Sequence, residues 1–318
     1  MNKEDAIKLS YLTDVVHGDQ TSQLARLFKI DRSNLVDLSK SMNPLAKDIS
    51  ELALNHVNVL RDYPNEEIAT GCLAEAMGVR PQNIILTNGA AEAIALVAQI
   101  FPRGYFHGPE FSLYERYIEI IDRKQGKLWR SNPNNPTGLL AADDIKADIW
   151  DESFYQLSCG TWTRMQNDND NIIIGSLTKL YNCPGLRIGY VMCKNEDIVS
   201  KIRSKKPSWS VNSLGVALIP ELLKTTDLIL WKKKIDDLKS RLVNKLNEMG
   251  YVTSDSAAPY VFVYNGVDLL LPLAKRGIFV RSCKSFGLDK DIRIAVPSEK
   301  NLALLLNTLE ELTIQTLK

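Results

Sequence analysis

The segment from Ser176 to Tyr190, SLTKLYNCPGLRIGY, holds the residues whose types and spacing are best suited to chemistry. Its lysine, Lys179, lies among polar and glycine residues, with Ser176 three positions before it and Arg187 eight positions after it. A lysine amine forms a Schiff base with a carbonyl group, and a nearby hydroxyl and guanidinium hold an anion. The spacing therefore indicates covalent binding of an anionic carbonyl compound, although an isolated lysine is usually a solvated surface residue.

A second segment, SNPNNPTG at residues 131–138, has the composition of a rigid polar loop. Two X-Pro steps restrict its backbone, and such a loop holds an asparagine amide in a fixed place. We expect Asn135 to be that amide. An ordinary turn does not require this composition.

A third segment predicts a site for an anion. Residues 83–87, NIILT, read as a buried strand, Asn88-Gly89 interrupts it, and residues 90–100 are apolar enough for a buried helix. Free backbone N–H groups and the helix dipole meet at such a turn. Gly89, Ala90 and Ala91 would supply these groups, although most turns between a strand and a helix bind nothing.

Further residues lie at positions typical of a ligand site. Asp151 follows the apolar stretch 145–150, and Phe111 follows Gly108-Pro109-Glu110. Arg281 and Arg293 both have apolar neighbours, so burial and pairing with an anion are favoured over exposure. For Asp151 the alternative is an exposed acid at a strand end, and for Phe111 a core side chain.

The composition restricts the class of protein. The chain has 318 residues, 45% hydrophobic and 24% charged, with a net charge of +1, as in a soluble globular protein of about two subdomains. The near-neutral charge offers no field for nucleic acid or membrane binding. We expect neither a signal peptide nor a membrane span. Five scattered cysteines and three distant histidines favour the reducing cytoplasm and predict no metal site.

These residues must be positioned by alternating strands and helices. Strands are predicted at residues 35–39, 83–87, 104–107, 127–129, 148–150, 172–175 and 188–193, and later at 261–264, 278–281 and 291–295. A long helical stretch is predicted from about 211 to 250 and a final helix at 300–317. The alternation implies an α/β fold whose parallel strands end at the ligand site. We expect a large ligand-binding domain (41–210), a small C-terminal α+β domain (211–318), and an N-terminal arm (1–40) associated with the small domain.

The pattern S-x-x-K-x5-G-x-R-x-G-Y and the loop at 131–138 resemble those of the fold type I pyridoxal-phosphate enzymes, the superfamily of class I and II aminotransferases. The resemblance implies a large domain with a mostly parallel seven-stranded sheet and a smaller α+β domain. It implies pyridoxal 5'-phosphate as cofactor, and a homodimer.

The resemblance also implies roles for residues. Lys179 would bind the cofactor aldehyde, Asp151 the ring nitrogen, Asn135 the phenolic oxygen, and Phe111 would stack on the ring. Tyr63 resembles the tyrosine that reaches the cofactor phosphate from the other subunit. The phosphate would otherwise be held by Gly89, Ala90, Ala91, Ser176 and Arg187.

Within the superfamily the chain is similar to the threonine-phosphate decarboxylases of cobalamin biosynthesis and, next, to the histidinol-phosphate aminotransferases. The shared segments are residues 88–94 (NGAAEAI), 110–116 (EFSLYER), 176–181 (SLTKLY) and 209–213 (WSVNS). The resemblance implies that a phosphorylated amino acid is bound by His17, Gly18, Ser41, Asn135, Arg281 and Arg293. The implied reaction is decarboxylation of O-phosphothreonine or O-phosphoserine for the nucleotide-loop linker of a cobamide, with a histidinol-phosphate-type aminotransferase as the alternative.

One position favours the decarboxylase. Many transaminases of the superfamily have tyrosine three residues after the aspartate, and this chain has Phe154 there, with Tyr155 adjacent. Two departures leave the substrate open: Asp19 replaces the second glycine of His-Gly-Gly, and Ser41 stands where the family often has asparagine. A pocket discriminates a single methyl by only about 1–3 kcal/mol, so both phospho-amino acids remain candidates.

Overall fold

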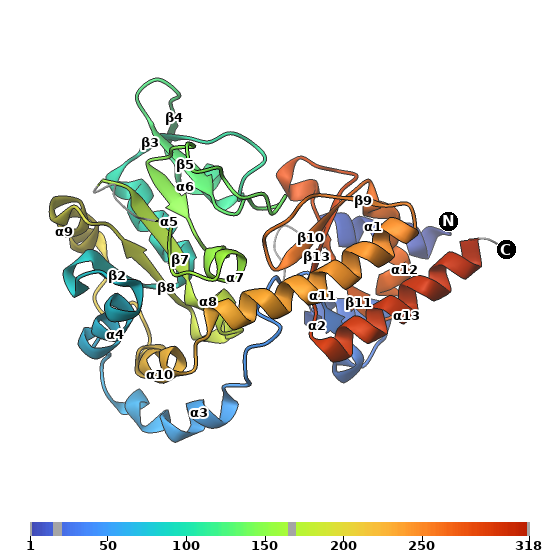
Figure 1. Ribbon diagram of the computed structural model, residues 1–318, viewed down its shortest axis with the longest axis horizontal. Coiled ribbons are helices and arrows are strands. Elements are labelled where there is room, and N and C mark those ends of the chain that lie inside the picture. The colour runs from blue at the N-terminus through green and yellow to red at the C-terminus, as the bar shows by residue number, and fades with distance from the viewer. Residues whose placement is uncertain (1, 15–20, 165–169, 317–318) are drawn as a thin grey trace. The chain divides into compact units, whose positions relative to one another are not determined.

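The computed structural model describes residues 2–14, 21–164 and 170–316. The chain divides into two compact units (Figure 1). We call one the central unit, formed by Ala46–Asn134 and Ala141–Lys232, and the other the terminal unit, formed by Met1–Leu45, Asn135–Leu140 and Lys233–Lys318. The proline-containing loop at 131–138 therefore passes from the central into the terminal unit at Asn135.

The central unit is built on a seven-stranded sheet in the order β2-β8-β7-β6-β5-β3-β4. All neighbouring pairs are parallel except those of β8, which is antiparallel to β2 and β7. The inner strands β7 and β8 are buried at every position, as expected of strands covered on both faces. The strand bounds are β2 Ile84–Asn88, β3 Arg103–Tyr105, β4 Ile120–Ile121, β5 Lys127–Ser131, β6 Ile149–Asp151, β7 Ile172–Ser176 and β8 Ile188–Met192.

Helices cover this sheet. The alanine-rich helix α5 (Gly89–Ile100) packs on β2, β7 and β8 and against α6 (Leu113–Tyr117) and α9 (Glu196–Lys205). Its buried face, with Ile94 and Val97, joins Trp129 of β5 and Ile174 of β7 in one hydrophobic core. Elsewhere α4 packs against α10. The remaining helices of the central unit are α3 Ser50–Asn55, η2 Val57–Arg61, α4 Glu67–Met77, η3 Pro81–Asn83, α7 Tyr155–Cys159, α8 Leu177–Leu180, η4 Pro184–Leu186 and α10 Ser213–Lys224.

The terminal unit contains a four-stranded antiparallel sheet in the order β12-β13-β10-β9 and a parallel pair, β1 with β11. Its strands are β1 Val36–Asp37, β9 Val252–Thr253, β10 Tyr260–Tyr264, β11 Ile278–Phe279, β12 Arg281–Ser282 and β13 Ile292–Ala295. Its helices are α1 Lys3–Asp14, α2 Thr21–Phe28, η1 Arg32–Asn34, η5 Gly266–Leu269, α12 Leu270–Ala274, η6 Lys284–Phe286 and α13 Glu299–Thr316, and α11 (Leu228–Glu248) enters it at Lys233.

The predicted α/β fold with a mostly parallel seven-stranded sheet is confirmed. The predicted helical stretch from 211 to 250 is two helices, because α10 ends at Lys224 and Asp227 accepts a hydrogen bond from Leu230 N–H (2.9 Å) at the start of α11. Strands β4 and β9, two residues each, were not expected. The domain boundaries at 40/41 and 210/211 remain predictions. In the described part of the chain, no helix is both long and apolar enough to span a membrane.

Candidate active site

The turn between β2 and α5 is shaped to receive an anion. Gly89 has φ +72°, and a Cβ there would lie 2.5 Å from Arg187 Nη2, so the absent side chain lets the guanidinium approach the backbone. A Cβ on Gly189 of β8 would lie 2.7 Å from the nitrogen of Ala90. The side chain of Asn88 makes no capping hydrogen bond to α5, and the first N–H groups of a helix have no intrahelical partners.

Ser176 and Arg187 lie beside this turn because of the strand order. Ser176 ends β7 opposite Gly189 of β8, and Gly189 is in turn opposite Thr87 of β2. Ser176 is buried and precedes the short helix α8, which carries Lys179. Arg187, with φ +50°, immediately precedes β8. The structure thus brings together the predicted set of Gly89, Ala90, Ser176 and Arg187.

Asp151 ends β6 and is buried. Its Oδ1 accepts a hydrogen bond from Ser153 N–H (2.9 Å) and its Oδ2 accepts one from the Tyr114 hydroxyl (3.0 Å). Burial raises the pKa of Asp151, and the hydrogen bonds from Ser153 and Tyr114 and the charge of Lys179 oppose that shift. A buried carboxylate with a lysine nearby is suited to hold a cationic group.

Aromatic rings accompany Asp151 and Lys179. The Nζ of Lys179 lies 5.3 Å from the ring centroid of Phe154. Phe111 is partly buried against the core, and its ring meets that of Tyr114 edge to face at 6.0 Å. Phe111 therefore has the core contacts of the alternative interpretation, and its stacking on a cofactor stays a prediction.

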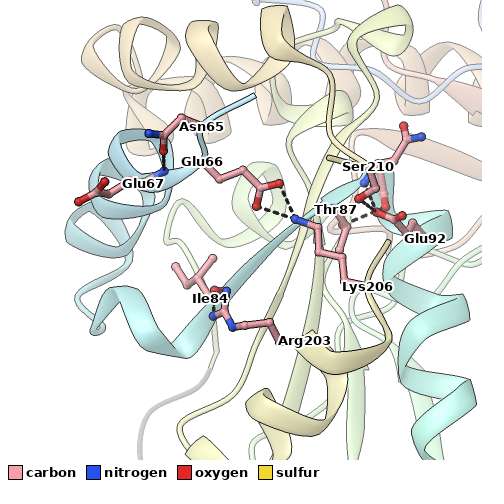
Figure 2. Close-up of polar contacts among 11 residues, drawn as sticks. Asn65, Glu66, Glu67, Ile84, Thr87, Glu92, Arg203, Lys206 and Ser210 are labelled. Atoms are coloured by element: carbon pink, nitrogen blue, oxygen red, sulfur yellow. Dashed lines mark hydrogen bonds and ion pairs between the residues drawn. The ribbon is translucent and has the colours of Figure 1, made fainter. Parts of the chain in front are cut away.

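The turn between β2 and α5 is held in place by Glu92 of α5. Its Oε2 accepts hydrogen bonds from Asn88 N–H (2.6 Å) and from the Ser210 hydroxyl (2.9 Å), and Thr87 donates to the Gly89 carbonyl (3.1 Å). Figure 2 shows Thr87, Glu92 and Ser210 close together. Because Glu92 uses the N–H of Asn88, the next N–H groups of the helix remain available for an anion.

Tyr63 lies in the loop between η2 and α4. This loop is held in place by contacts with residues that precede α10 or begin it. Lys206 forms a bidentate ion pair with Glu66 (2.5 and 2.6 Å, Figure 2), and the Ser213 hydroxyl donates to the Asp62 carbonyl (2.7 Å). The ring of Tyr63 stacks on Trp209 at 4.5 Å, although Tyr63 is 77% exposed and Trp209 59% exposed.

A second group of predicted residues belongs to the terminal unit. Arg293 of β13 is buried, donates from Nη1 to Asn135 Oδ1 (2.5 Å) and from Nη2 to the Ser39 carbonyl (3.3 Å), and lies 4.7 Å from the ring centroid of Tyr260. Its Nε is buried without a hydrogen-bond partner. The structure thus joins the predicted Asn135 and Arg293, which lie 158 residues apart.

Arg281 and Ser41 complete this group. Arg281 of β12 faces Arg293 in the antiparallel register, is 4% exposed, and donates to Ser285 Oγ (2.7 Å). Burial, and then the charge of Arg293, lower the pKa of Arg281 to about 10. The hydroxyl of Ser41 is buried without a partner. Two adjacent buried guanidiniums are suited to bind anions. His17 and Gly18 lie outside the described residues.

No pattern in the sequence marks Tyr114 or Glu92 as a site residue when each is taken by itself. Tyr114 lies 37 residues before Asp151 and appeared only within a shared segment of the chain. Glu92 lies four residues after Asn88, the spacing at which a side chain reaches back to the start of its own helix. That spacing was a usable signal.

Residues 115–309 match the family of class I and II aminotransferases. The chain belongs to that family.

Relatives of this aminotransferase-family chain include two enzyme types. It is 30% identical to a histidinol-phosphate aminotransferase of Caldanaerobacter subterraneus subsp. tengcongensis, over 87% of this chain and 89% of the relative. It is 26% identical to a threonine-phosphate decarboxylase of Salmonella typhimurium, over 94% and 98%. The solved histidinol-phosphate aminotransferase of Sinorhizobium meliloti, in complex with pyridoxal-5'-phosphate, has the same fold, with a TM-score of 0.78, 17% identity and coverage of 94% and 95%.

Members of the family depend on pyridoxal phosphate, and this chain is a pyridoxal-phosphate-dependent enzyme. The central unit fits the cofactor. The turn at Gly89, which has no Cβ, leaves backbone N–H groups accessible to the phosphate. The buried carboxylate of Asp151 suits the ring nitrogen, and Lys179 supplies an amine for the aldehyde. The assignment of each residue to its part of the cofactor stays a prediction.

Proposed function

We propose that this chain is a decarboxylase of an O-phosphorylated hydroxy amino acid. The substrate is O-phospho-L-threonine or O-phospho-L-serine, and the product is aminopropanol phosphate or ethanolamine phosphate for the nucleotide-loop linker of a cobamide. The similarity to the Salmonella enzyme over nearly all of both chains supports this proposal.

The observation that carries the proposal is the pair of buried arginines. Arg281 and Arg293 face each other across β12 and β13, and adjacent buried cations of like charge are costly unless an anion joins them. A phosphorylated amino acid carries two anionic groups, a carboxylate and a phosphate. The orphan Nε of Arg293 and the orphan hydroxyl of Ser41 are further donors for such a ligand.

Phe154, three residues after Asp151, also supports decarboxylation. Phe154 occupies the position of the tyrosine found in many transaminases, and its ring lies near Lys179. The neighbouring Tyr155 does not replace that tyrosine, because its hydroxyl is hydrogen-bonded to Cys159 of the same helix α7. A phenol that would tune the cofactor is therefore missing from this position.

The residues then have the following tasks. Arg281 and Arg293 bind and orient the anionic groups of the substrate. Bound pyridoxal phosphate supplies the aldehyde that takes up the substrate amine and the ring that accepts the electron pair of the broken bond. Asp151 holds the proton on the ring nitrogen, and the Nζ of Lys179 returns a proton to the substrate Cα after carbon dioxide has left.

The second candidate is a histidinol-phosphate-type aminotransferase. The 30% identity to the Caldanaerobacter enzyme favours it, and the same lysine would then remove a proton from the substrate carbon. The two reactions share the cofactor and Lys179, so residues of the cofactor site do not discriminate them.

The products discriminate them. Purified protein with bound cofactor is incubated with O-phospho-L-threonine, O-phospho-L-serine, or L-histidinol phosphate plus 2-oxoglutarate. We expect carbon dioxide and the phosphorylated amine in equal amounts from a phospho-amino acid, and no glutamate from the third mixture. Glutamate formation without carbon dioxide release would establish the aminotransferase instead.

We also propose a homodimer in which Tyr63 reaches the cofactor phosphate of the second copy. Tyr63 and Trp209 are exposed and in contact with each other, and polar contacts of the neighbouring Asp62 and Glu66 fix the loop that carries Tyr63. Such an arrangement is expected of side chains that lie at an interface. Light scattering after gel filtration should give twice the 35.7 kDa mass of the chain. A monomer at micromolar concentration would refute this part of the proposal.

A further inference from the structure

Glu110 is a buried acid of the central unit that the proposed mechanism does not use. It lies in the loop before α6 and contacts Ser131, the last residue of β5. Its Oε1 and Oε2 accept hydrogen bonds from Ser131 N–H (3.1 and 3.2 Å), and Oε2 also forms a short hydrogen bond with the Ser131 hydroxyl.

The contacts continue from Ser131 to Asp151. The hydroxyl of Tyr114 is hydrogen-bonded to the Ser131 side chain and donates to Asp151 Oδ2 at 3.0 Å. Ser131 and Asp151 are also partners in the register of β5 and β6. Four side chains thus form one buried chain of hydrogen bonds, Glu110–Ser131–Tyr114–Asp151.

The number of protons fixes the direction of this chain. A serine hydroxyl and a tyrosine hydroxyl each have one proton to donate. If Glu110 carries a proton, it donates to Ser131, Ser131 donates to Tyr114, and Tyr114 donates to Asp151. If Glu110 is ionised, Ser131 must turn its proton to Glu110, and the chain is broken at Tyr114.

We infer that Glu110, Ser131 and Tyr114 form a buried hydrogen-bond relay that positions the carboxylate of Asp151, with Glu110 as its proton-bearing end. Tyr114 and Glu110 are then positioning residues for the ring-nitrogen carboxylate. The inference rests on the proposed cofactor role of Asp151, and it holds for a decarboxylase and for an aminotransferase.

The charges around the relay agree with a neutral Glu110. Burial raises the pKa of Glu110 to about 8, the hydrogen bonds from Ser131 and the charge of Arg130 oppose that shift, and the charge of Asp151 reinforces it. Lys179 faces Asp151, and Asp151 and Glu110 both raise the pKa of Tyr114 further above its usual value after burial. Two nearby buried carboxyl groups favour one shared negative charge, which leaves the charge on Asp151.

The first test measures cofactor binding. Tyr114→Phe removes the hydrogen-bond donor to Asp151. The dissociation constant for pyridoxal phosphate should rise about tenfold at pH 7, because a hydrogen bond to a charged group is lost. Tyr117→Phe, on the same helix, is the matched control and should bind as the wild type does. Equal binding by both variants would overturn the inference.

The second test measures the pH dependence of stability. Glu110→Gln keeps a donor and an acceptor for Ser131 but does not titrate, and Glu115→Gln is an exposed control with the same charge change. Because the pKa of Glu110 is raised in the folded chain, its contribution to stability is fully present below the ordinary carboxyl pKa. That contribution is lost as pH rises to about 8. Glu110→Gln should therefore flatten the fall of the melting temperature between about pH 5 and 8, whereas Glu115→Gln should not.

The outcomes separate this inference from the proposed function. A Glu110→Gln profile identical to that of the wild type overturns the relay, whatever the protein catalyses. Glu110→Gln should also bind the cofactor within about twofold of the wild type at pH 7, because it copies the neutral acid. A failure to release carbon dioxide overturns the decarboxylase and leaves both measurements of the relay valid.

Discussion

At the scale of single residues, a few buried polar side chains would be energetically costly without a ligand. Arg293 has a buried Nε without a partner, and Ser41 has a buried hydroxyl without one. Each unsatisfied buried polar group costs roughly 1–3 kcal/mol. Both unpartnered groups are explained if a substrate anion completes their hydrogen bonds, and Arg293 has Arg281 as its neighbour on β12.

Replacing Arg293 by lysine tests that explanation. Arg293→Lys keeps the charge but loses the planar fork that binds a carboxylate through two hydrogen bonds, so KM for the phospho-amino acid should rise about 10- to 100-fold. Arg26→Lys, at an exposed position of α2, is the control. Steady-state kinetics measures both, and an unchanged KM for Arg293→Lys would exclude it as an anion ligand.

Lys179 is tested by removal of its amine. Lys179→Ala should lower kcat by at least about 10³-fold, because both the covalent attachment and the proton transfer are lost. The melting temperature should stay close to that of the exposed control Lys205→Ala. A Lys179→Ala variant that still turns over substrate at a rate similar to the wild type contradicts the assignment.

At the scale of the elements, the strand order brings together the residues of the proposed anion site. Strands β2, β8 and β7 are neighbours, so the turn after β2, the end of β7 and the beginning of β8 meet although they lie far apart in the chain. Gly89 is the point of closest approach, because Arg187 occupies the space of its missing Cβ.

Gly89→Ala should therefore damage both the fold and the cofactor site. The added Cβ meets Arg187 Nη2 at 2.5 Å and the residue has φ +72°, so we expect a loss of about 1–3 kcal/mol in the free energy of unfolding together with weaker cofactor binding. Gly71→Ala, inside α4 with no atom within 4 Å of its Cβ, should gain about 0.5–1 kcal/mol. Denaturant unfolding of both variants measures the difference, and similar values would contradict the packing argument.

The elements that were predicted correctly have strong local signals. The run of isoleucines in β7 and the alanine-rich helix α5 are examples, because periodicity and apolar content decide such segments. The break before α11 was missed although Asp227 is a helix-start residue. The relay to Asp151 was missed for another reason: Tyr114 and Glu110 meet Asp151 and Ser131 only through the pairing of β5 with β6, which no local pattern encodes. The hydrogen bond between Asn135 and Arg293 was not predicted, because the family resemblance implied only that both residues bind the substrate.

At the scale of the whole molecule, we expect two sets of acids to give the stability a maximum in mildly acidic solution. Burial raises the pKa of Glu110 to about 8 and that of Glu152 to about 7. Hydrogen bonds from neighbouring serines lower the pKa of the exposed Asp31 and Asp48.

The sign of each set follows from proton linkage. The folded chain binds protons more strongly than the unfolded chain at Glu110 and Glu152, so stability falls as pH rises from about 4.5 to 8. At Asp31 and Asp48 the folded chain binds protons less strongly than the unfolded chain. Protonation of these carboxylates therefore favours unfolding, and stability also falls as pH drops below about 4. We expect the highest melting temperature near pH 5. A melting temperature that rises steadily from pH 5 to 8 would contradict the burial of both glutamates.

The central claim is that the amine of Lys179 binds the aldehyde of pyridoxal phosphate. The most direct measurement is borohydride reduction of the protein with its cofactor, followed by digestion and mass spectrometry of the peptide containing residues 176–187. The account predicts a reduced pyridoxyl-phosphate adduct on Lys179 and its disappearance in Lys179→Ala. An adduct on another lysine, or a folded protein that takes up no cofactor, would contradict it.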